Sequence, residues 1–143
     1  MNRLMKILVV PILILVIFFI FQHFNNTEKT ISLKTYDSAV SYIENGWIPS
    51  NIPSSSKNIS VTYDMDTSIS NGEFQLNNTL EIDTFKSSLS QELISNLNIK
   101  FIDNNFKKLF SNITSKNSSD KIYTYKYFVF LFYGNKIYFF TKS

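Results

Sequence analysis

The residues best suited to chemistry in this chain are three carboxylates. Asp64 and Asp66 are two positions apart in a run of alternating apolar and polar residues, so they share the polar face of a predicted strand. Glu81 lies in the next alternating run. Such a group can bind a hard cation, or one carboxyl can act as a general acid. A solvated acidic face is the alternative, so we take the three only as candidate metal ligands.

Other common catalytic groups are scarce. The single histidine, His23, follows a long apolar segment, the chain has no cysteine, and it has only three glycines. The rest of the chain therefore lacks the histidine that a Ser-His-Asp triad needs and the histidine or cysteine ligands that a zinc site needs. Glycine-rich phosphate-binding motifs are absent too. We expect a protein that is not an enzyme, and we assign no catalytic residue and no cofactor.

The apolar segment predicts a membrane anchor. Residues 7–21 carry no charge, and residues 4–24 as a helix would be roughly 31 Å long, enough to cross a hydrocarbon core of roughly 30 Å. A cleaved signal peptide is the alternative, but no A-x-A-like site follows. Arg3 and Lys6 precede the segment, which places the amino terminus in the cytoplasm.

This gives a division of the chain into four parts. Residues 1–6 form a cytoplasmic tail and residues 7–24 a transmembrane signal-anchor in the lipid bilayer of the cell (inner) membrane. Residues 25–31 form a polar stalk, and residues 32–143 form an extracytoplasmic domain. Residues 25–143 carry twelve lysines, eleven acidic residues and no arginine. Because nucleic-acid binding needs a basic, usually arginine-bearing face, we expect no nucleic-acid partner.

Periodicity predicts the elements of the domain. Residues 32–44 have helical spacing, and the loop from Trp47 to Pro53 should pack over one end of the core. Residues 59–82 read as a β-hairpin with its turn at Asn71-Gly72, which pairs Val61 with Ile82. Residues 83–113 then have the spacing of two helices, with a break at residues 96–98.

The carboxyl-terminal segment predicts a second hairpin. Its strands span residues 122–133 and 136–142, with the turn at Gly134-Asn135, so that Phe130 pairs with Phe139. Both faces of these strands are apolar, so they should be central in the sheet and covered on both sides. The predicted fold is α+β: an antiparallel sheet of two β-hairpins packed with short amphipathic helices, preceded by one N-terminal transmembrane helix.

A local motif carries a family resemblance. It runs Gly46-Trp47-Ile48-Pro49, then Pro53, then Asp64-Met65-Asp66-Thr67, with Phe74 closing the next strand. Over residues 36–82 the chain resembles uncharacterised bacterial YbbD-like small envelope proteins, found near Rhs elements and often bearing an N-terminal lipoprotein or membrane signal. Ser55-Ser56 depart from the pattern, in which a small residue often follows the second proline. The resemblance implies no catalytic residue, and the Rhs neighbourhood implies an immunity or accessory role.

These observations favour a membrane-anchored extracytoplasmic binding protein. Its expected partner is a toxin or another envelope protein, for which it would serve as an immunity or accessory protein. The residues assigned to the partner surface are Trp47, Pro49, Asp64 and Asp66. The alternatives are a cation-binding or carboxylate-dependent enzyme domain that uses Asp64, Asp66 and Glu81, or a structural envelope component.

Overall fold

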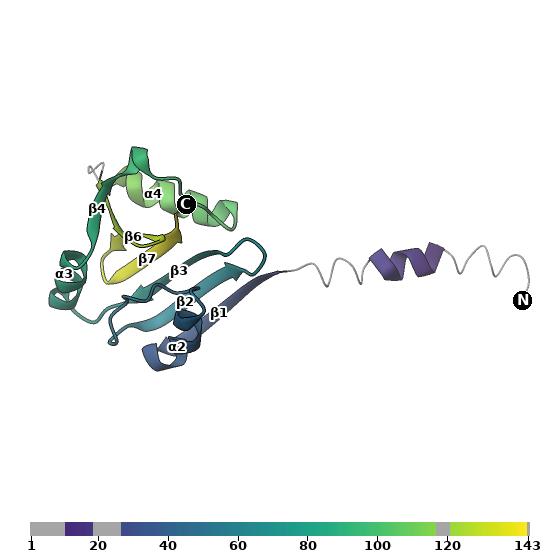
Figure 1. The fold of residues 1–143 in the computed structure, drawn as a ribbon, viewed down its shortest axis with the longest axis horizontal. Coiled ribbons are helices and arrows are strands. Elements are labelled where there is room, and N and C mark those ends of the chain that lie inside the picture. Colours follow the sequence, from purple (N-terminus) through teal and green to yellow (C-terminus); the bar gives the residue numbers. More distant parts are fainter. Residues whose placement is uncertain (1–10, 19–26, 117–120, 143) are drawn as a thin grey trace, which may run out of the picture.

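The computed structural model describes residues 11–18, 27–116 and 121–142 (Figure 1). Its domain is α+β with an antiparallel sheet, as predicted. The sheet has seven strands where two hairpins are predicted, in the order β1-β2-β3-β7-β6-β5-β4. The strands are β1 (Glu28–Thr35), β2 (Lys57–Asp64), β3 (Ile69–Gln75), β4 (Ser90–Leu93), β5 (Lys121–Tyr125), β6 (Phe128–Tyr133) and β7 (Lys136–Thr141). The helices are α2 (Tyr36–Glu44), α3 (Thr79–Ser87) and α4 (Asn104–Lys116), with a 3₁₀ turn at Ile94–Asn96.

The amino-terminal predictions are only partly covered by the structure. Residues 11–18 are helical, with exposed side chains. Within the described ranges, no helix has both the length and the apolar character needed to cross a bilayer, so the predicted transmembrane helix is unsupported. Residues 1–10 and 19–26, which include the cytoplasmic tail and the ends of the predicted anchor, lie outside the described residues. The predicted stalk at residues 25–31 is corrected, because β1 already begins at Glu28 and pairs with β2.

Two hydrophobic clusters cover the two faces of the sheet. On one side, which we call the α2/α3 face, Ala39 of α2 and Phe85 of α3 pack on the sheet. On the opposite side, the α4 face, Phe110 and Ile113 of α4 do so. The central strands contribute to both clusters, since Phe130 and Phe139 belong to the first and Val129 and Phe140 to the second. The prediction of central strands covered on both sides is confirmed.

The carboxyl-terminal hairpin has the predicted register. Phe130 pairs with Phe139, and Val129 pairs with Phe140. Gly134 has a φ of +60°, the positive value that a glycine-first hairpin turn requires. One detail differs: residues 122–133 are not one strand, because a turn at Lys126-Tyr127 divides them into β5 and β6.

The amino-terminal hairpin has a different turn from the predicted one. The turn lies between Asp64 and Ile69, and Val61 pairs with Gly72 instead of Ile82. Gly72 lies inside β3, where a Cβ atom would be 2.3 Å from the Ser60 carbonyl oxygen and 2.5 Å from the Phe139 ring. The glycine therefore permits close packing against β7, and Asn-Gly does not mark a turn here.

Asn71 has a tertiary role beside it. Its side chain is fully buried, and its amide nitrogen donates to the carbonyl oxygens of Ser70 (2.7 Å) and Lys100 (3.1 Å). Its amide oxygen accepts a hydrogen bond of 2.8 Å from the Ile102 backbone nitrogen. Asn71 thus fastens the segment before α4 to the middle of the sheet.

The helix predictions need corrections as well. The helix expected at residues 32–44 begins at Tyr36, because the preceding residues continue β1. In place of the two helices expected over residues 83–113, the chain forms α3, the short strand β4 and α4. Helix α3 starts at Thr79, inside the segment predicted as a strand, since Asn78 and Glu81 form a capping box at its start.

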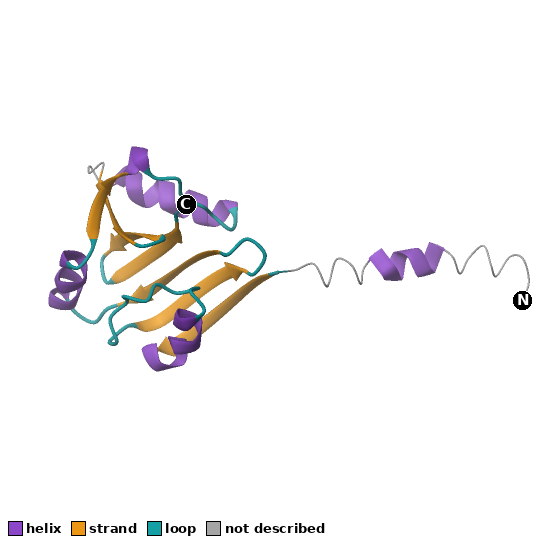
Figure 2. Cartoon of the chain, in the orientation of Figure 1, coloured by secondary structure: helices purple, strands orange, loops and turns teal. Residues whose placement is uncertain are grey.

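The strand order reveals two related units on either side of β7. On one side of β7, strands β1, β2 and β3 run in sequence order from the edge of the sheet to its centre. On the other side, β4, β5 and β6 do the same. Each unit has the order strand, helix, strand, strand, with α2 in the first and α4 in the second. A two-fold rotation about the axis of β7 exchanges the two sets of three strands and also exchanges the two faces of the sheet. This agrees with the positions of α2 and α4, which pack on opposite faces (Figure 2). We call these the N-terminal unit (residues 28–75) and the C-terminal unit (residues 90–133).

Candidate functional site

The candidate metal ligand Asp64 serves as an acceptor within the β2–β3 turn. Its carboxylate accepts hydrogen bonds from the Asp66 backbone nitrogen at 3.0 Å and from the Thr67 hydroxyl at 2.8 Å. A hydrogen bond from the Thr27 side chain, together with these two, lowers the pKa of Asp64 below its usual value. The carboxylate is therefore engaged in holding the turn and the start of β1 together.

The three candidate carboxylates do not form one site. Asp66 is exposed on the turn, whereas Glu81 lies at the start of α3, where its carboxylate accepts from the Asn77 backbone nitrogen at 3.0 Å. Across the described part of the chain, no three His, Cys, Asp or Glu side chains gather as metal ligands. The structure thus gives Asp64 and Glu81 local structural roles.

The predicted partner surface is divided as well. Trp47 is half-buried and stacks on Tyr63, with ring centroids 4.7 Å apart, and Pro49 is buried. Trp47 packs against the core cluster on the α2/α3 face, together with the fully buried Ile48. The expectation that this loop covers part of the core is confirmed. Asp64 follows Tyr63 in β2 and so points to the opposite face, which means that the four residues do not form one surface.

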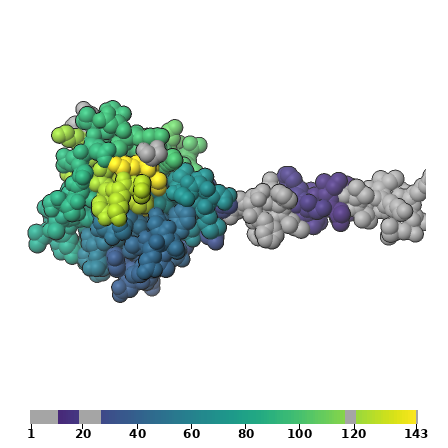
Figure 3. Space-filling view, in the orientation of Figure 1, coloured from purple at the N-terminus to yellow at the C-terminus, as the bar shows by residue number. Residues whose placement is uncertain are grey.

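A pocket lies on the α2/α3 face, between the proline loop and α3. Its volume is about 360 Å³. The residues that line it are Asn51 and Pro53 of the loop and Leu80, Glu81, Thr84, Phe85 and Ser88 of α3. In the space-filling view of Figure 3, the blue surface of the N-terminal part of the domain borders the yellow-green surface of the C-terminal strands. Between these two parts, the Lys126 Nζ donates to the Ser50 hydroxyl at 3.4 Å.

Asn51, one of the lining residues, has an amide group without a partner. Its amide nitrogen and amide oxygen are both buried, and neither has a hydrogen-bond partner among the residues that the structure describes. A buried donor or acceptor left without a partner costs about 1–3 kcal/mol. Both atoms are closed off from solvent, so the accessible surface that Asn51 gives to the pocket is not its amide group.

The opposite wall is apolar and anchored. Leu80 is 77% exposed, although it is a large aliphatic residue in the first turn of α3. Phe85, one turn further on, is only 3% exposed and packs edge-on against Phe130 at 5.3 Å and Phe74 at 5.7 Å. The base of the pocket is therefore part of the core, and its mouth carries an uncovered aliphatic side chain.

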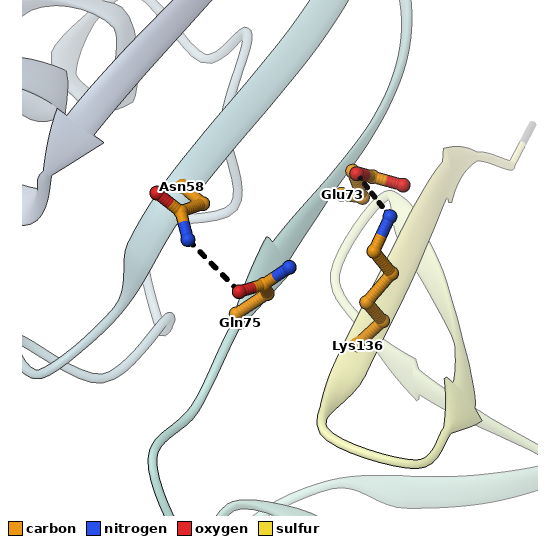
Figure 4. Close-up of polar contacts among 4 residues, drawn as sticks. All are labelled: Asn58, Glu73, Gln75 and Lys136. Carbon is orange, nitrogen blue, oxygen red and sulfur yellow. Dashed lines mark hydrogen bonds and ion pairs between the residues drawn. The ribbon is translucent and has the colours of Figure 1, made fainter.

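The polar face of the N-terminal unit offers a contrast, because its groups pair with one another. Figure 4 shows Asn58 donating to Gln75 at 2.9 Å and Lys136 donating to Glu73 at 2.8 Å. The hydrogen bond to Glu73 raises the pKa of Lys136 above its usual value. A second cavity, of about 460 Å³, borders α4, but its Asp103 accepts from the Asn105 and Phe106 backbone nitrogens at the start of that helix.

The pocket residues were not identified by sequence reasoning. Asn51 was treated only as part of the proline loop, and Leu80 was assigned to a strand facing the core. The capping-box spacing of Asn78 and Glu81 was the available signal, since it places Leu80 in the exposed first turn of a helix. Nothing in the sequence indicates that the loop and α3 meet.

The comparisons with known proteins identify one part of the chain. Residues 27–75 match the model of the YbbD head domain, which confirms the resemblance given by the Trp-Ile-Pro motif. The matched segment starts one residue before β1 and ends with β3, so it coincides with the N-terminal unit. No curated protein and no solved structure matches the chain.

Proposed function

We propose that this chain, YbbD-like in its N-terminal unit, is a membrane-anchored extracytoplasmic binding protein without enzymatic activity. Its partner is another envelope protein or an incoming toxin, and it acts as an immunity or accessory protein. The observation that carries the proposal is the pocket between the proline loop and α3, whose mouth carries the exposed Leu80.

The exposure of Leu80 favours binding at this pocket. Covering an exposed leucine contributes about 1.5–3 kcal/mol when the burial is complete. A partner seated on the pocket covers this side chain together with the apolar lining.

The proposed location rests on the amino-terminal sequence. Residues 7–24 are the anchor, and Arg3 and Lys6 hold the amino terminus in the cytoplasm, which leaves the domain outside. Within the described helical residues 11–18, each apolar side chain from Ile12 to Phe18 is about half exposed. A lipid bilayer is an environment in which such a set of side chains is covered.

The functional test is protection from a toxin whose gene lies beside that of this chain. We expect cells expressing the full chain to survive the toxin, and cells expressing Leu80→Glu to lose that protection. Leu93→Glu is the matched control, since Leu93 is also exposed, at 44%, but lies on β4 away from the pocket. If the wild-type chain neither protects nor co-purifies with a specific protein from membranes, the proposal fails.

The anchor has a separate test. After an alkaline wash, we expect the full chain to stay with the membrane pellet, and external protease to digest the domain in spheroplasts. A chain released by the wash, or one protected from protease, would contradict the proposed location.

A further inference from the structure

We infer that two copies of this chain pair through β1. The two strands join antiparallel about a two-fold axis at Ile31 and so make one continuous sheet. Such a contact is isologous, because both copies use the same edge. The inference goes beyond the proposed function and does not rest on it, since β1 contributes no residue to the pocket between the proline loop and α3.

The free edge of β1 presents a row of backbone hydrogen-bonding groups. β1 is the outermost strand on its side of the sheet (Figure 1). The Thr27 carbonyl oxygen, directly before β1, accepts a hydrogen bond of 3.3 Å from the Met65 backbone nitrogen, so Thr27 faces the side of β2. Alternate residues of a strand direct their N–H and C=O groups to opposite sides. The residues that direct these groups to the free edge are therefore Glu28, Thr30, Ser32 and Lys34.

The length and regularity of this edge favour pairing with another strand. β1 has eight residues and no proline, and its register with β2 is constant from Glu28 to Thr35. The strand at the opposite edge of the sheet, β4, has only four residues. Short strands, prolines and bulges commonly keep an edge strand from pairing with another chain, and β1 has none of these three features.

The charges on this edge fit a second copy of the same strand. Glu28 and Lys34 are both exposed and are equally distant from Ile31 in the sequence. In an antiparallel pair centred on Ile31, Glu28 therefore faces Lys34 of the second copy, and this contact occurs twice. Among the residues that the structure describes, neither side chain forms an ion pair, and Glu28 lies opposite the like-charged Asp64 of β2. The second copy thus supplies a cation beside Glu28.

The charges also select one register. With the centre at Ile31, all four outward-facing residues of each β1 form hydrogen-bonded pairs, which gives about eight backbone hydrogen bonds in total. A shift by two residues reduces this number and moves Glu28 away from Lys34. A shift by one residue would place the side chains of opposite sheet faces next to each other. The centred register is therefore the one in which both the backbone and the charges are paired.

The other face of the paired strands is apolar at its centre. Ile31 and Leu33 are half-buried and pack against the hydrophobic cluster on the α2/α3 face. In the dimer, Ile31 meets Ile31 of the second copy, and Leu33 meets the aliphatic part of Lys29. The two α2 helices lie at opposite ends of the pair, because each follows the carboxyl end of its own β1. The dimer thus extends the core of the α2/α3 face across the edge.

A cysteine on the two-fold axis tests the pairing and its register. The chain has no cysteine, so Ile31→Cys gives the purified full chain, in detergent micelles, a single thiol. The two Cα atoms at this position are about 4.5 Å apart in the dimer, which a disulfide can bridge. We expect mild oxidation to convert most of the variant to a covalent dimer.

Two further cysteine variants are the controls. In Ser32→Cys the two Cα atoms are about 8 Å apart, so crosslinking should be at least about fivefold slower than for Ile31→Cys. Asn105→Cys, at an exposed position on α4, measures random collision. Faster crosslinking of Ser32→Cys than of Ile31→Cys would overturn the inferred register.

A charge exchange tests the same contact in a chain without cysteine. Glu28→Lys or Lys34→Glu alone places like charges opposite each other at both ends of the pair. The dimer Kd, measured by sedimentation equilibrium, should then rise about tenfold. The double variant restores opposite charges, so its Kd should return to within about threefold of the wild-type value. Lys108→Glu, at an exposed position on α4, is the control and should leave Kd unchanged.

The inference is overturned if wild type sediments as a monomer and Ile31→Cys crosslinks no faster than Asn105→Cys. It is also overturned if the double charge variant dimerises as weakly as the single ones. A third contrary outcome is a crosslink, in membranes, between Ile31→Cys and another envelope protein in place of the dimer. The edge would then receive a strand of that partner.

Discussion

The N-terminal and C-terminal units share a topology about β7, but they differ in how their sheet faces are covered. In the C-terminal unit both faces are buried, by α4 on one side and α3 on the other. In the N-terminal unit the α2/α3 face is buried, whereas the α4 face carries polar residues, of which Asn71 beside β7 is the buried one. Helix α3 has no counterpart on the α4 face of that unit, so the two-fold relation stops at this helix.

The side chains follow this difference. Phe128 and Phe130 point towards α3 in the C-terminal unit. At the corresponding face of the N-terminal unit, Thr62 pairs with Thr30 through their hydroxyls at 2.9 Å, and Glu73 pairs with Lys136. The same backbone arrangement thus supports an apolar face where a helix covers it and a self-paired polar face where none does. The comparison shows that α3 is the element that distinguishes the units, and α3 also builds the candidate pocket.

The largest expected effect comes from removing the ring by which α3 holds the sheet. Phe85→Ala leaves a cavity among Phe74, Phe130 and Phe132 and should lower the free energy of unfolding by about 3–5 kcal/mol. Urea denaturation measures this loss. The milder Phe85→Leu should lose less, and a loss below about 1 kcal/mol for Phe85→Ala would mean that α3 is not a part of the core.

The next effect is at the seam between the N-terminal unit and β7. Gly72→Ala places a methyl group against the Ser60 carbonyl oxygen and the Phe139 ring, and should destabilise the fold by about 1–3 kcal/mol. Gly46→Ala has a different cost, because Gly46 has a positive φ (+79°), which Gly72 lacks, and no atom lies within 4 Å of the new methyl group. If Gly72→Ala leaves the free energy of unfolding unchanged, the close approach of the Phe139 ring to Gly72 is not a constraint.

A smaller effect should appear at the turn that Asp64 holds. Because the folded-state pKa of Asp64 is lowered, its contribution is present above the usual pKa of about 4 and is lost as the pH falls through the lowered value. Asp64→Asn should therefore lower the urea midpoint at pH 7 and reduce the loss of stability on acidification. Equal pH profiles for wild type and Asp64→Asn would contradict this role. The corresponding β5–β6 turn, at Lys126-Tyr127, contains no carboxylate to titrate.

The smallest effect is expected on the uncovered face. Thr62→Val removes the hydroxyl contact with Thr30 and should change the free energy of unfolding by no more than about 0.5 kcal/mol. Val61→Thr, at the neighbouring and fully buried position, should cost more, because it buries a hydroxyl on the α2/α3 face. Comparable losses from the two variants would show that the α4 face of the N-terminal unit is covered after all.

Sequence reasoning succeeded where local signals and tertiary structure agree. Gly134 supplies the positive φ of a hairpin turn, and the apolar residues on both sides of it lie on two buried faces, so the register was predictable. It failed at Asn71-Gly72, which has the same local signal. There Asn71 bonds to Lys100 and Ile102, and Gly72 accommodates Phe139, which are contacts made about 30 and 67 positions further along the chain.

The pocket could not be predicted for a related reason. It exists because a loop that follows α2 meets a helix that follows β3, and neither sequence segment specifies the other. The lack of a partner for the Asn51 amide and the exposure of Leu80 both depend on how the loop and α3 lie in the folded domain. Asp64, in contrast, is predicted on the polar face of a strand that continues to Asn71-Gly72, whereas it is the last residue of β2 and its carboxylate accepts hydrogen bonds from the turn that follows.

The position of β7 has a consequence for how the chain is made. It joins the two units in the sheet, yet it is the last strand in the sequence, so β3 and β6 remain unjoined until residue 141 has been synthesised. The emerging polypeptide then has no completed sheet, and contacts of such large sequence separation form slowly. This order therefore delays completion of the sheet until β7 is available to pair with both β3 and β6.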